Sequence, residues 1–127
     1  MPQEFKVEII SPDKRIYSGE TEETVLPCFE GQVTILKDHI PLITFLRPGL
    51  IEIGKNEKFY AEDGTVEFSN NNLLILSTTV QSLKNMKTEK ISIMLKEAEN
   101  RLSASEITDK QKYILNYKIE TLKQINW

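Results

Sequence analysis

The side chains best suited to chemistry are few in this chain. It contains one histidine, His39, and one cysteine, Cys28, which lie eleven positions apart among 127 residues. A zinc site needs three or four protein ligands, so this pair does not predict a metal site. Asp38 precedes His39, as in a charge-relay pair, but side chains adjacent in sequence rarely face each other. We therefore expect His39 to bond to backbone or to contact a partner.

The remaining candidates for catalysis are weak as well. Cys28 follows Pro27 at a predicted strand end, with no basic residue near it in sequence to lower the pKa of its thiol. We expect a structural thiol and not a nucleophile. The acidic pairs Glu22–Glu23 and Glu62–Asp63 are typical of exposed strand faces, and no glycine-rich phosphate loop occurs. The sequence therefore predicts no catalytic residue, no bound metal and no cofactor.

Short strands are predicted from Phe5 to Thr78, and these would position any site. Phe5, Val7 and Ile9 alternate with Lys6 and Glu8, which is the period of a half-buried strand. Many short strands with turns between them predict a β-sandwich or barrel. The turn signals are Ser11–Lys14, Arg47–Gly49, Gly54–Glu57, Asp63–Gly64 and Asn70–Asn72.

Several strand boundaries can be predicted more closely. Arg15–Tyr17 predicts a short strand ended by Ser18-Gly19, followed by a weakly alternating strand over Glu20–Leu26. Leu42–Leu46 is a nearly continuous apolar run, which favours a strand packed between two sheets. Before it, Gly31 allows a turn with positive φ, and Pro41 stiffens the loop that follows Leu36.

The pattern becomes helical from Thr88 onward, in a region without glycine or proline. The apolar positions of a first helix fall within one narrow stripe. Thr108 and Gln111 predict a capping box, so a second helix should begin near Asp109. The fold prediction is mainly β with an α appendage: an antiparallel β-sandwich over residues 1–84 and a two-helix hairpin over 85–127. The first stripe contains Ile91, Met94, Leu95, Ala98 and Leu102, and the second Leu115, Ile119, Leu122 and Ile125.

Charge differs between these two parts. Residues 1–83 carry 7 Lys and Arg against 13 Asp and Glu, whereas residues 84–127 carry 9 against 6. A basic tail favours an acidic partner surface. Acidic residues are interspersed among its lysines, which argues against nucleic acid. Tyr113, Tyr117 and Trp127 lie off the main apolar stripe or at the chain end, and either partner contact or packing on the sandwich would account for them.

The compartment can be inferred from the same sequence. A single cysteine forms no internal disulfide, which favours a reducing compartment. Met1–Glu4 lacks the features of a signal or transit peptide. No apolar run approaches the roughly 18 residues of a transmembrane helix. We expect a cytosolic protein, and attachment to a membrane-bound machine stays open.

The stretch from Leu26 to Thr44 carries a family resemblance. It contains Glu30-Gly31, Ile35-Leu36, His39, Pro41-Leu42 and Thr44, with Ser11-Pro12 and Tyr17-Ser18-Gly19 before it and Pro48-Gly49 after it. In this order and spacing the motifs resemble the epsilon subunit of F-type ATP synthases over nearly the whole chain.

The resemblance implies a non-catalytic subunit of the central rotor stalk of a proton- or sodium-translocating ATP synthase. In that family the sandwich binds the gamma subunit and rests on the membrane-embedded c-ring. The helical arm lies folded or extends toward the catalytic alpha/beta head, where it hinders ATP hydrolysis.

The resemblance also implies interface residues. Glu30, Gly31 and Gln32, with Ser11 nearby, match the turn that meets the ring. His39, Pro41, Leu42 and Thr44 match the loop near gamma and the ring. The arm lysines, chosen by charge as contacts for an acidic segment of the beta subunit, are Lys110, Lys112, Lys118 and Lys123.

One family feature is altered. Some bacterial members bind ATP through an aspartate and an arginine at the start of the first helix, where this chain has Lys87 and Lys90. Lysine neither accepts the hydrogen bonds of a carboxylate nor forks like arginine, so we expect no nucleotide site.

Two other interpretations remain open. One is a free-standing β-sandwich that binds a small ligand and dimerises through the helical hairpin. The other, and the weakest, is a small hydrolase that uses His39.

Overall fold

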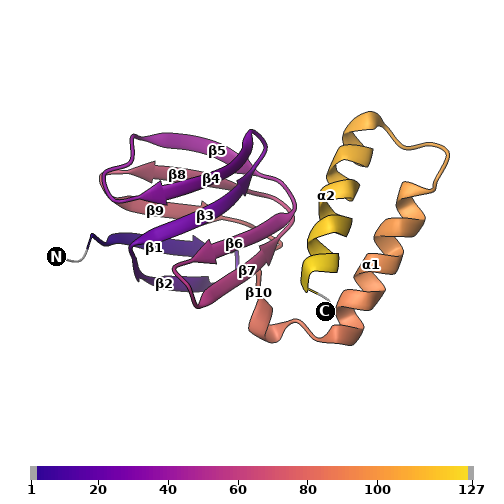
Figure 1. Cartoon of the computed structure of the whole chain (residues 1–127), viewed down its shortest axis with the longest axis horizontal. Helices are drawn as coiled ribbons and strands as arrows, with labels where there is room; N and C mark the ends of the chain where they lie inside the picture. The colour runs from indigo at the N-terminus through magenta and orange to yellow at the C-terminus, as the bar shows by residue number, and fades with distance from the viewer. Residues whose placement is uncertain (1–2, 126–127) are drawn as a thin grey trace. The chain divides into compact units, whose positions relative to one another are not determined.

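The computed structural model describes residues 3–125 and divides the chain into two compact units, residues 1–83 and 84–127. The first unit is built of strands and the second of helices (Figure 1).

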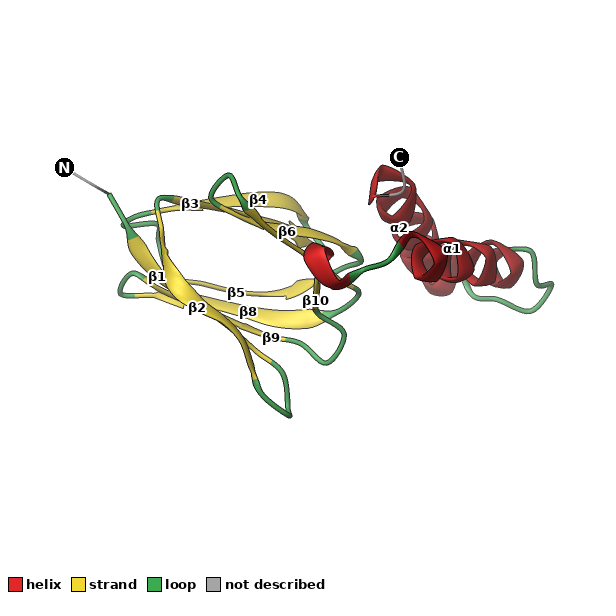
Figure 2. Cartoon of the chain, turned by 90° about the horizontal axis from the view of Figure 1, so that it is seen from below, coloured by secondary structure: helices red, strands yellow, loops and turns green. Residues whose placement is uncertain are grey.

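Within the described residues ten strands form two layers, which share a connected set of hydrogen bonds (Figure 2). One layer contains β4 (Gly31–Leu36), β3 (Glu23–Cys28), β6 (Gly49–Ile53), β7 (Glu57–Ala61) and β10 (Gln81–Ser82). The other contains β5 (Leu42–Leu46), β8 (Gly64–Ser69), β9 (Asn72–Leu76), β1 (Phe5–Ile10) and β2 (Arg15–Thr21). The layers join where Cys28 of β3 pairs with Leu46 of β5.

The predicted antiparallel sandwich is confirmed, with one parallel pairing, between β1 and β9, among the described strands. Alternation explains the core: Phe5, Val7 and Ile9 of β1 are buried, while Lys6 is exposed. Phe5 also packs edge-to-face on Phe68 of β8, with ring centroids 5.6 Å apart.

The predicted end of β2 at Ser18-Gly19 is wrong, because the strand continues to Thr21. Gly19 pairs with Val7, and a Cβ at Gly19 would lie 2.6 Å from the Tyr17 hydroxyl oxygen. The missing side chain therefore leaves room for the Tyr17 ring within the strand. The predicted strand over Glu20–Leu26 is also wrong, since the chain turns at Glu22, where the Thr21 hydroxyl donates to the carbonyl of Glu23.

The turn predicted at Asn70–Asn72 is confirmed between β8 and β9. Asn70 and Asn71 adopt φ of 50° and 58°, a left-handed conformation that asparagine tolerates.

The second unit begins within a short 3₁₀ turn, η1 (Leu83–Asn85), and contains α1 (Thr88–Leu102) and α2 (Asp109–Ile125). The capping box is confirmed: the Thr108 amide donates to Gln111 Oε1 at 2.9 Å, and the Gln111 amide donates to Thr108 Oγ1 at 3.1 Å. Ala98, Leu115 and Ile119 form the buried centre of the hairpin, and Leu95, Leu102 and Ile107 pack around it. No helix within residues 3–125 is long and apolar enough to cross a membrane.

Candidate protein-interaction surface

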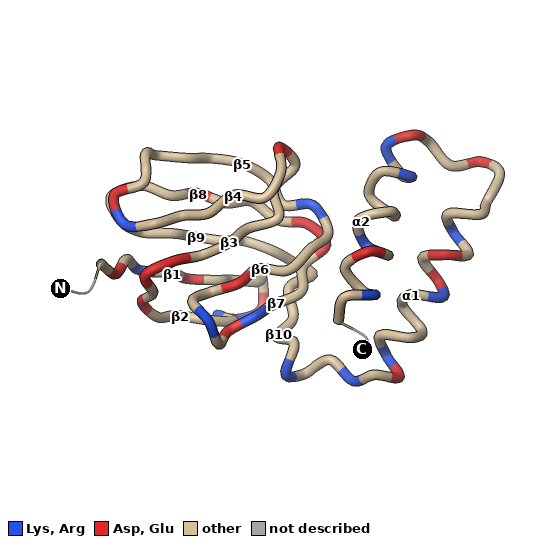
Figure 3. Tube along the Cα trace, viewed as in Figure 1, with Lys and Arg blue, Asp and Glu red and all other residues tan. Residues whose placement is uncertain are grey.

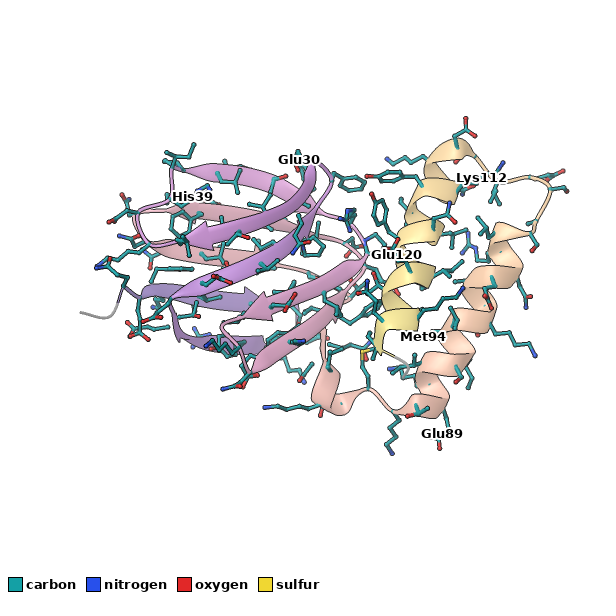
Figure 4. The ribbon with its side chains drawn as sticks, in the orientation of Figure 1. Glu30, His39, Glu89, Met94, Lys112 and Glu120 are labelled. Carbon is teal, nitrogen blue, oxygen red and sulfur yellow. The ribbon has the colours of Figure 1, made fainter. Side chains whose placement is uncertain are left out.

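The turn between β3 and β4 presents a carboxylate whose position is fixed. Gly31 adopts φ of 128°, the positive value predicted for it. The hydroxyl of Thr44 on β5 lies 2.5 and 2.6 Å from the two carboxylate oxygens of Glu30. This hydrogen bond is the largest cause that holds the pKa of Glu30 below its ordinary value of 4.5. The exposed Glu30 therefore stays ionised at one end of the sandwich (Figure 4).

Gln32 and Ser11 complete the polar residues predicted for this end. Gln32 is exposed at the start of β4. Ser11 follows the last residue of β1 and lies at the same end. Ile10 pairs with Leu76, Leu76 pairs with Thr65, and Thr65 pairs with Phe45, so the end of β1 is level with the end of β5. Its hydroxyl bonds to the carbonyl of Lys14 at 3.1 Å and so closes its own turn.

His39, Pro41 and Leu42 lie at the opposite end, so the eight predicted interface residues do not form a single site. Figure 4 shows Glu30 and His39 at the two ends of the sandwich. β4 runs from one end to the other, and β5 returns. Thr44 therefore belongs with Glu30, and His39 belongs with the loop between β4 and β5.

The expectation that His39 bonds to backbone is confirmed. Its Nδ1 lies 2.6 Å from the Ile40 carbonyl oxygen, and its ring packs edge-to-face on Phe68 with centroids 5.9 Å apart. The carbonyl can only accept, so Nδ1 carries the proton. Asp38 bonds instead to Asn71, through its amide at 2.7 Å and its carboxylate at 2.9 Å. The charge-relay arrangement required by a His39 hydrolase does not form.

The outer face of β5 is apolar and exposed, which overturns the prediction of a strand packed on both sides. Thr44 and Leu46 point into the sandwich, whereas Ile43 is 77% exposed and Phe45 is 57% exposed. Ile40, in the preceding loop, is 75% exposed. We call Ile40, Ile43 and Phe45 the β5 face. Sequence reasoning missed it because an apolar run looks the same whether its second face meets a sheet or a partner; the polar Thr44 within the run was the available signal.

Cys28 is a buried, free thiol, as predicted. Burial is the main cause that raises the pKa of Cys28 to about 11, and the Glu30 carboxylate raises it further. Contrary to prediction, a basic residue does act on it: Arg47 lowers the pKa of Cys28, but less than burial raises it. Among residues 3–125, no group of three or more His, Cys, Asp or Glu could hold a metal ion.

The four arm lysines do not share one side of α2. At about 100° per residue, Lys112 and Lys123 lie about 20° apart around the helix axis, while Lys110 lies about 160° from Lys112. Lys110, Lys112 and Lys123 are exposed and Lys118 is half-buried. Figure 3 shows acidic and basic residues interspersed along both helices.

The aromatic residues of the second helix pack on each other. Tyr113 and Tyr117 lie edge-to-face with ring centroids 4.9 Å apart, and Trp127 lies outside the described residues.

The two altered nucleotide positions lie at the start of α1. Lys87 is the N-cap residue and makes no side-chain capping bond, and Lys90 follows in the first turn. The absence of a nucleotide site remains a prediction.

Comparison with known proteins agrees with this architecture. Residues 4–82 match the family described as "ATP synthase, Delta/Epsilon chain, beta-sandwich domain". The ATP synthase epsilon chain of Pelagibacter ubique is 45% identical over 99% of this chain and 100% of its own length. That of Trichodesmium erythraeum is 34% identical over 93% of this chain and 88% of its own length.

Solved structures show the same fold at low identity. A chain of the Euglena gracilis mitochondrial ATP synthase (OSCP/F1/c-ring) superposes with a TM-score of 0.79 at 18% identity, covering 98% of this chain and 82% of its own. A chain of the Tetrahymena thermophila mitochondrial ATP synthase, described as central stalk and c-ring, gives 0.67 at 16% identity, with 96% of each chain covered.

The match covers both the sandwich and the helices, which favours a subunit over a free-standing ligand-binding protein. It also confirms that the chain is an accessory subunit and not itself an enzyme. The chain belongs to the epsilon-chain family of ATP synthases.

Proposed function

We propose that this chain is a rotor-stalk subunit that joins the gamma subunit to the c-ring and restrains ATP hydrolysis through its helical hairpin. The observation that carries the proposal is the β5 face, whose three side chains are the most exposed large apolar ones among the described residues of the sandwich. Exposed apolar patches of this kind mark protein interfaces.

The gamma subunit is the proposed partner of the β5 face and of His39, Pro41 and Leu42 beside it. Ile40, Ile43 and Phe45 supply apolar contact area without any charge among them. Thr65 and Glu67 of β8 pair with Phe45 and Ile43, and as exposed polar neighbours they form a rim. An apolar centre with a polar rim is typical of stable protein interfaces.

The c-ring is the proposed partner of the opposite end, through Glu30, Gly31, Gln32 and Ser11. A fixed, ionised carboxylate at a turn suits a basic or hydrogen-bond-donating loop on the partner. Contact of one partner at each end would let the sandwich transmit rotation between them.

The hairpin is the proposed regulatory arm. Each of its helices carries one apolar stripe, with Ile91 and Ala98 buried on α1 and Leu115, Ile119, Leu122 and Ile125 buried on α2. We expect a hairpin of two such stripes to change its packing partner at low cost. The excess of basic residues favours an acidic segment of the catalytic head as its second docking site. Through these partners the chain would be peripheral to a bacterial inner membrane, on the cytoplasmic face, in a complex that moves protons or sodium ions.

The test is ATP hydrolysis by the cognate alpha–beta–gamma head with the full chain, with residues 1–84, or with neither. Binding by both forms, with slower hydrolysis only for the full chain, is expected. Failure of both forms to bind would reject the proposal, whereas binding without any inhibition would reject the regulatory role alone.

A charge-reversal series tests which side of α2 contacts the catalytic head. Replacement of Lys112 and Lys123 by glutamate reverses two charges on one side of α2, and replacement of Lys110 and Lys118 reverses two charges elsewhere. We expect the first pair to relieve inhibition more than the second. Equal relief would mean that net charge, and not one side of the helix, determines the contact.

A further inference from the structure

The loop between β4 and β5, residues 37–41, is held unusually firmly for an exposed segment. The His39 amide donates to the Leu36 carbonyl at 3.1 Å, which closes a turn, and the His39 ring bonds to the Ile40 carbonyl and packs on Phe68. Pro41 fixes the backbone at the far side of the loop.

The most distant anchor of this loop comes from the β8–β9 turn, 33 residues away in sequence. The Asp38 amide donates to Asn71 Oδ1 at 2.7 Å, and Asn71 Nδ2 donates to Asp38 Oδ1 at 2.9 Å. We call this reciprocal pair the 38–71 clasp. It uses both functional ends of the Asn71 amide, so the amide orientation follows from the pair itself.

Both residues of the clasp adopt the left-handed backbone conformation, which most residues disfavour and which asparagine and aspartate tolerate. Asp38 adopts φ of 67° and Asn71 adopts φ of 58°. Such conformations persist where the surroundings determine them strongly. The Asn71 carbonyl also accepts from the Lys6 amide at 3.0 Å, so the turn that carries the clasp is tied to β1.

The bonds engage the polar groups of Asp38 and His39 within the chain and leave the apolar side chain of Ile40 without such an anchor. Ile40 is 75% exposed, directly after the anchored Asp38 and His39. Binding through a rigid loop avoids the entropy loss of ordering that loop on association. An exposed isoleucine on a fixed backbone therefore has the properties of a pre-organised contact.

We propose that Asn71 is a positioning residue: the 38–71 clasp fixes the loop so that Ile40 meets an apolar surface of the partner. This inference rests on the proposed function, which names that partner as the gamma subunit. Asn71 itself need not contact the partner.

The test compares two identical substitutions in one turn. Asn71→Gly removes the clasp, and glycine accepts the positive φ. Asn70→Gly is the matched control, because Asn70 also has positive φ, at 50°, and takes part in the turn through its backbone carbonyl. Both substitutions add similar freedom to the unfolded chain, so this contribution cancels in the comparison.

Binding to the cognate alpha–beta–gamma head is the first readout. We expect the Kd of N71G to be about tenfold higher than that of N70G, which should bind like the unaltered chain. Amide hydrogen exchange of the free proteins is the second readout: exchange at Asp38 should accelerate in N71G and stay slow in N70G.

A double-mutant cycle with Ile40→Ala separates positioning from general structural damage. If the clasp acts by placing Ile40, then I40A weakens binding strongly in the unaltered chain and much less in the N71G background. Additive effects of I40A and N71G would overturn the inference, as would equal affinity of N70G and N71G. Failure of the unaltered chain to bind the head would instead reject the proposed function, and with it the partner of Ile40.

Discussion

The sandwich and the helical hairpin differ in how much of each is core. In the sandwich, long strands of both layers contribute to one buried cluster that includes Phe5, Phe59 and Phe68. In the hairpin, two helices of 15 and 17 residues bury aliphatic side chains and no aromatic ring among the described residues, namely Ile91, Ala98, Leu115, Ile119, Leu122 and Ile125. Helices of this length are marginal alone in water and depend on packing for stability.

This difference suits two tasks. A sheet that buries aromatic side chains between its layers holds its shape, and its turns can present contacts at fixed positions. A hairpin of two helices with one aliphatic stripe each can exchange one packing partner for another at low cost in free energy. The following predictions test whether the two units differ in this way.

The largest effect should come from the sandwich core. Phe68→Ala removes a ring that is 1% exposed and packs on both Phe5 and His39, so it should lower the free energy of unfolding by about 3–5 kcal/mol. Ile119→Ala, in the hairpin, should reduce the helical content and leave the midpoint of unfolding of the sandwich unchanged. Denaturation followed by far-ultraviolet circular dichroism, together with amide hydrogen exchange read separately in the strands and in the helices, measures both. A single shared transition shifted equally by the two variants would contradict the division into two units.

The next effect concerns the turn before β8. Gly64 has φ of 152°, and a Cβ there would lie 2.7 Å from the Leu76 carbonyl oxygen. Gly64→Ala should therefore destabilise the sandwich by about 2 kcal/mol. Ser103→Ala, at the joint of the hairpin where the backbone is right-handed, is the comparison and should change stability by less than about 0.5 kcal/mol.

A smaller effect is expected at the start of α2. Thr108→Ala removes one half of the capping box and should cost about 1 kcal/mol of helix stability. Hydrogen exchange should then accelerate in the first turn of α2 and remain unchanged in β3 and β6. An unchanged α2 would show that tertiary packing, and not the cap, fixes the start of this helix.

The smallest effect on stability should come from Thr44→Val, which keeps the shape of the side chain and removes the hydrogen bond to Glu30. The pKa of Glu30 should rise toward 4.5, as NMR titration would show. Because the native pKa is lowered, its stabilising contribution is complete at neutral pH and is lost as the pH falls below 4.5 toward the native pKa. The unaltered chain should thus lose more stability on acidification than the variant.

Local signals predicted much of the fold. The β1 alternation, the Asn70–Asn72 turn and the Thr108–Gln111 capping box each depend on residues within a few positions of one another. Such features follow from backbone preferences and side-chain period, which a sequence displays directly.

The features that the sequence analysis missed depend on side-chain packing in three dimensions, most of it between distant residues. β2 continues through Gly19 because the Tyr17 ring occupies the space of the absent side chain. The bond between Thr44 and Glu30 spans 14 positions, and that between Asp38 and Asn71 spans 33. The exposed side of β5 depends on what covers it in an assembly. The two long-range bonds produce no pattern in a local window, and for β5 the only local signal was the polar Thr44.

One consequence of the strand arrangement is mechanical. β4 connects the Glu30 turn to the loop that carries His39, and its six residues span about 20 Å. A pull between these two ends acts along the strand, so the hydrogen bonds that pair β4 with β3 from Glu23 to Cys28 share the load in shear. Strands pulled lengthwise resist together, whereas strands peeled from one end open bond by bond. The sandwich is therefore stiffest along the direction that separates its two ends.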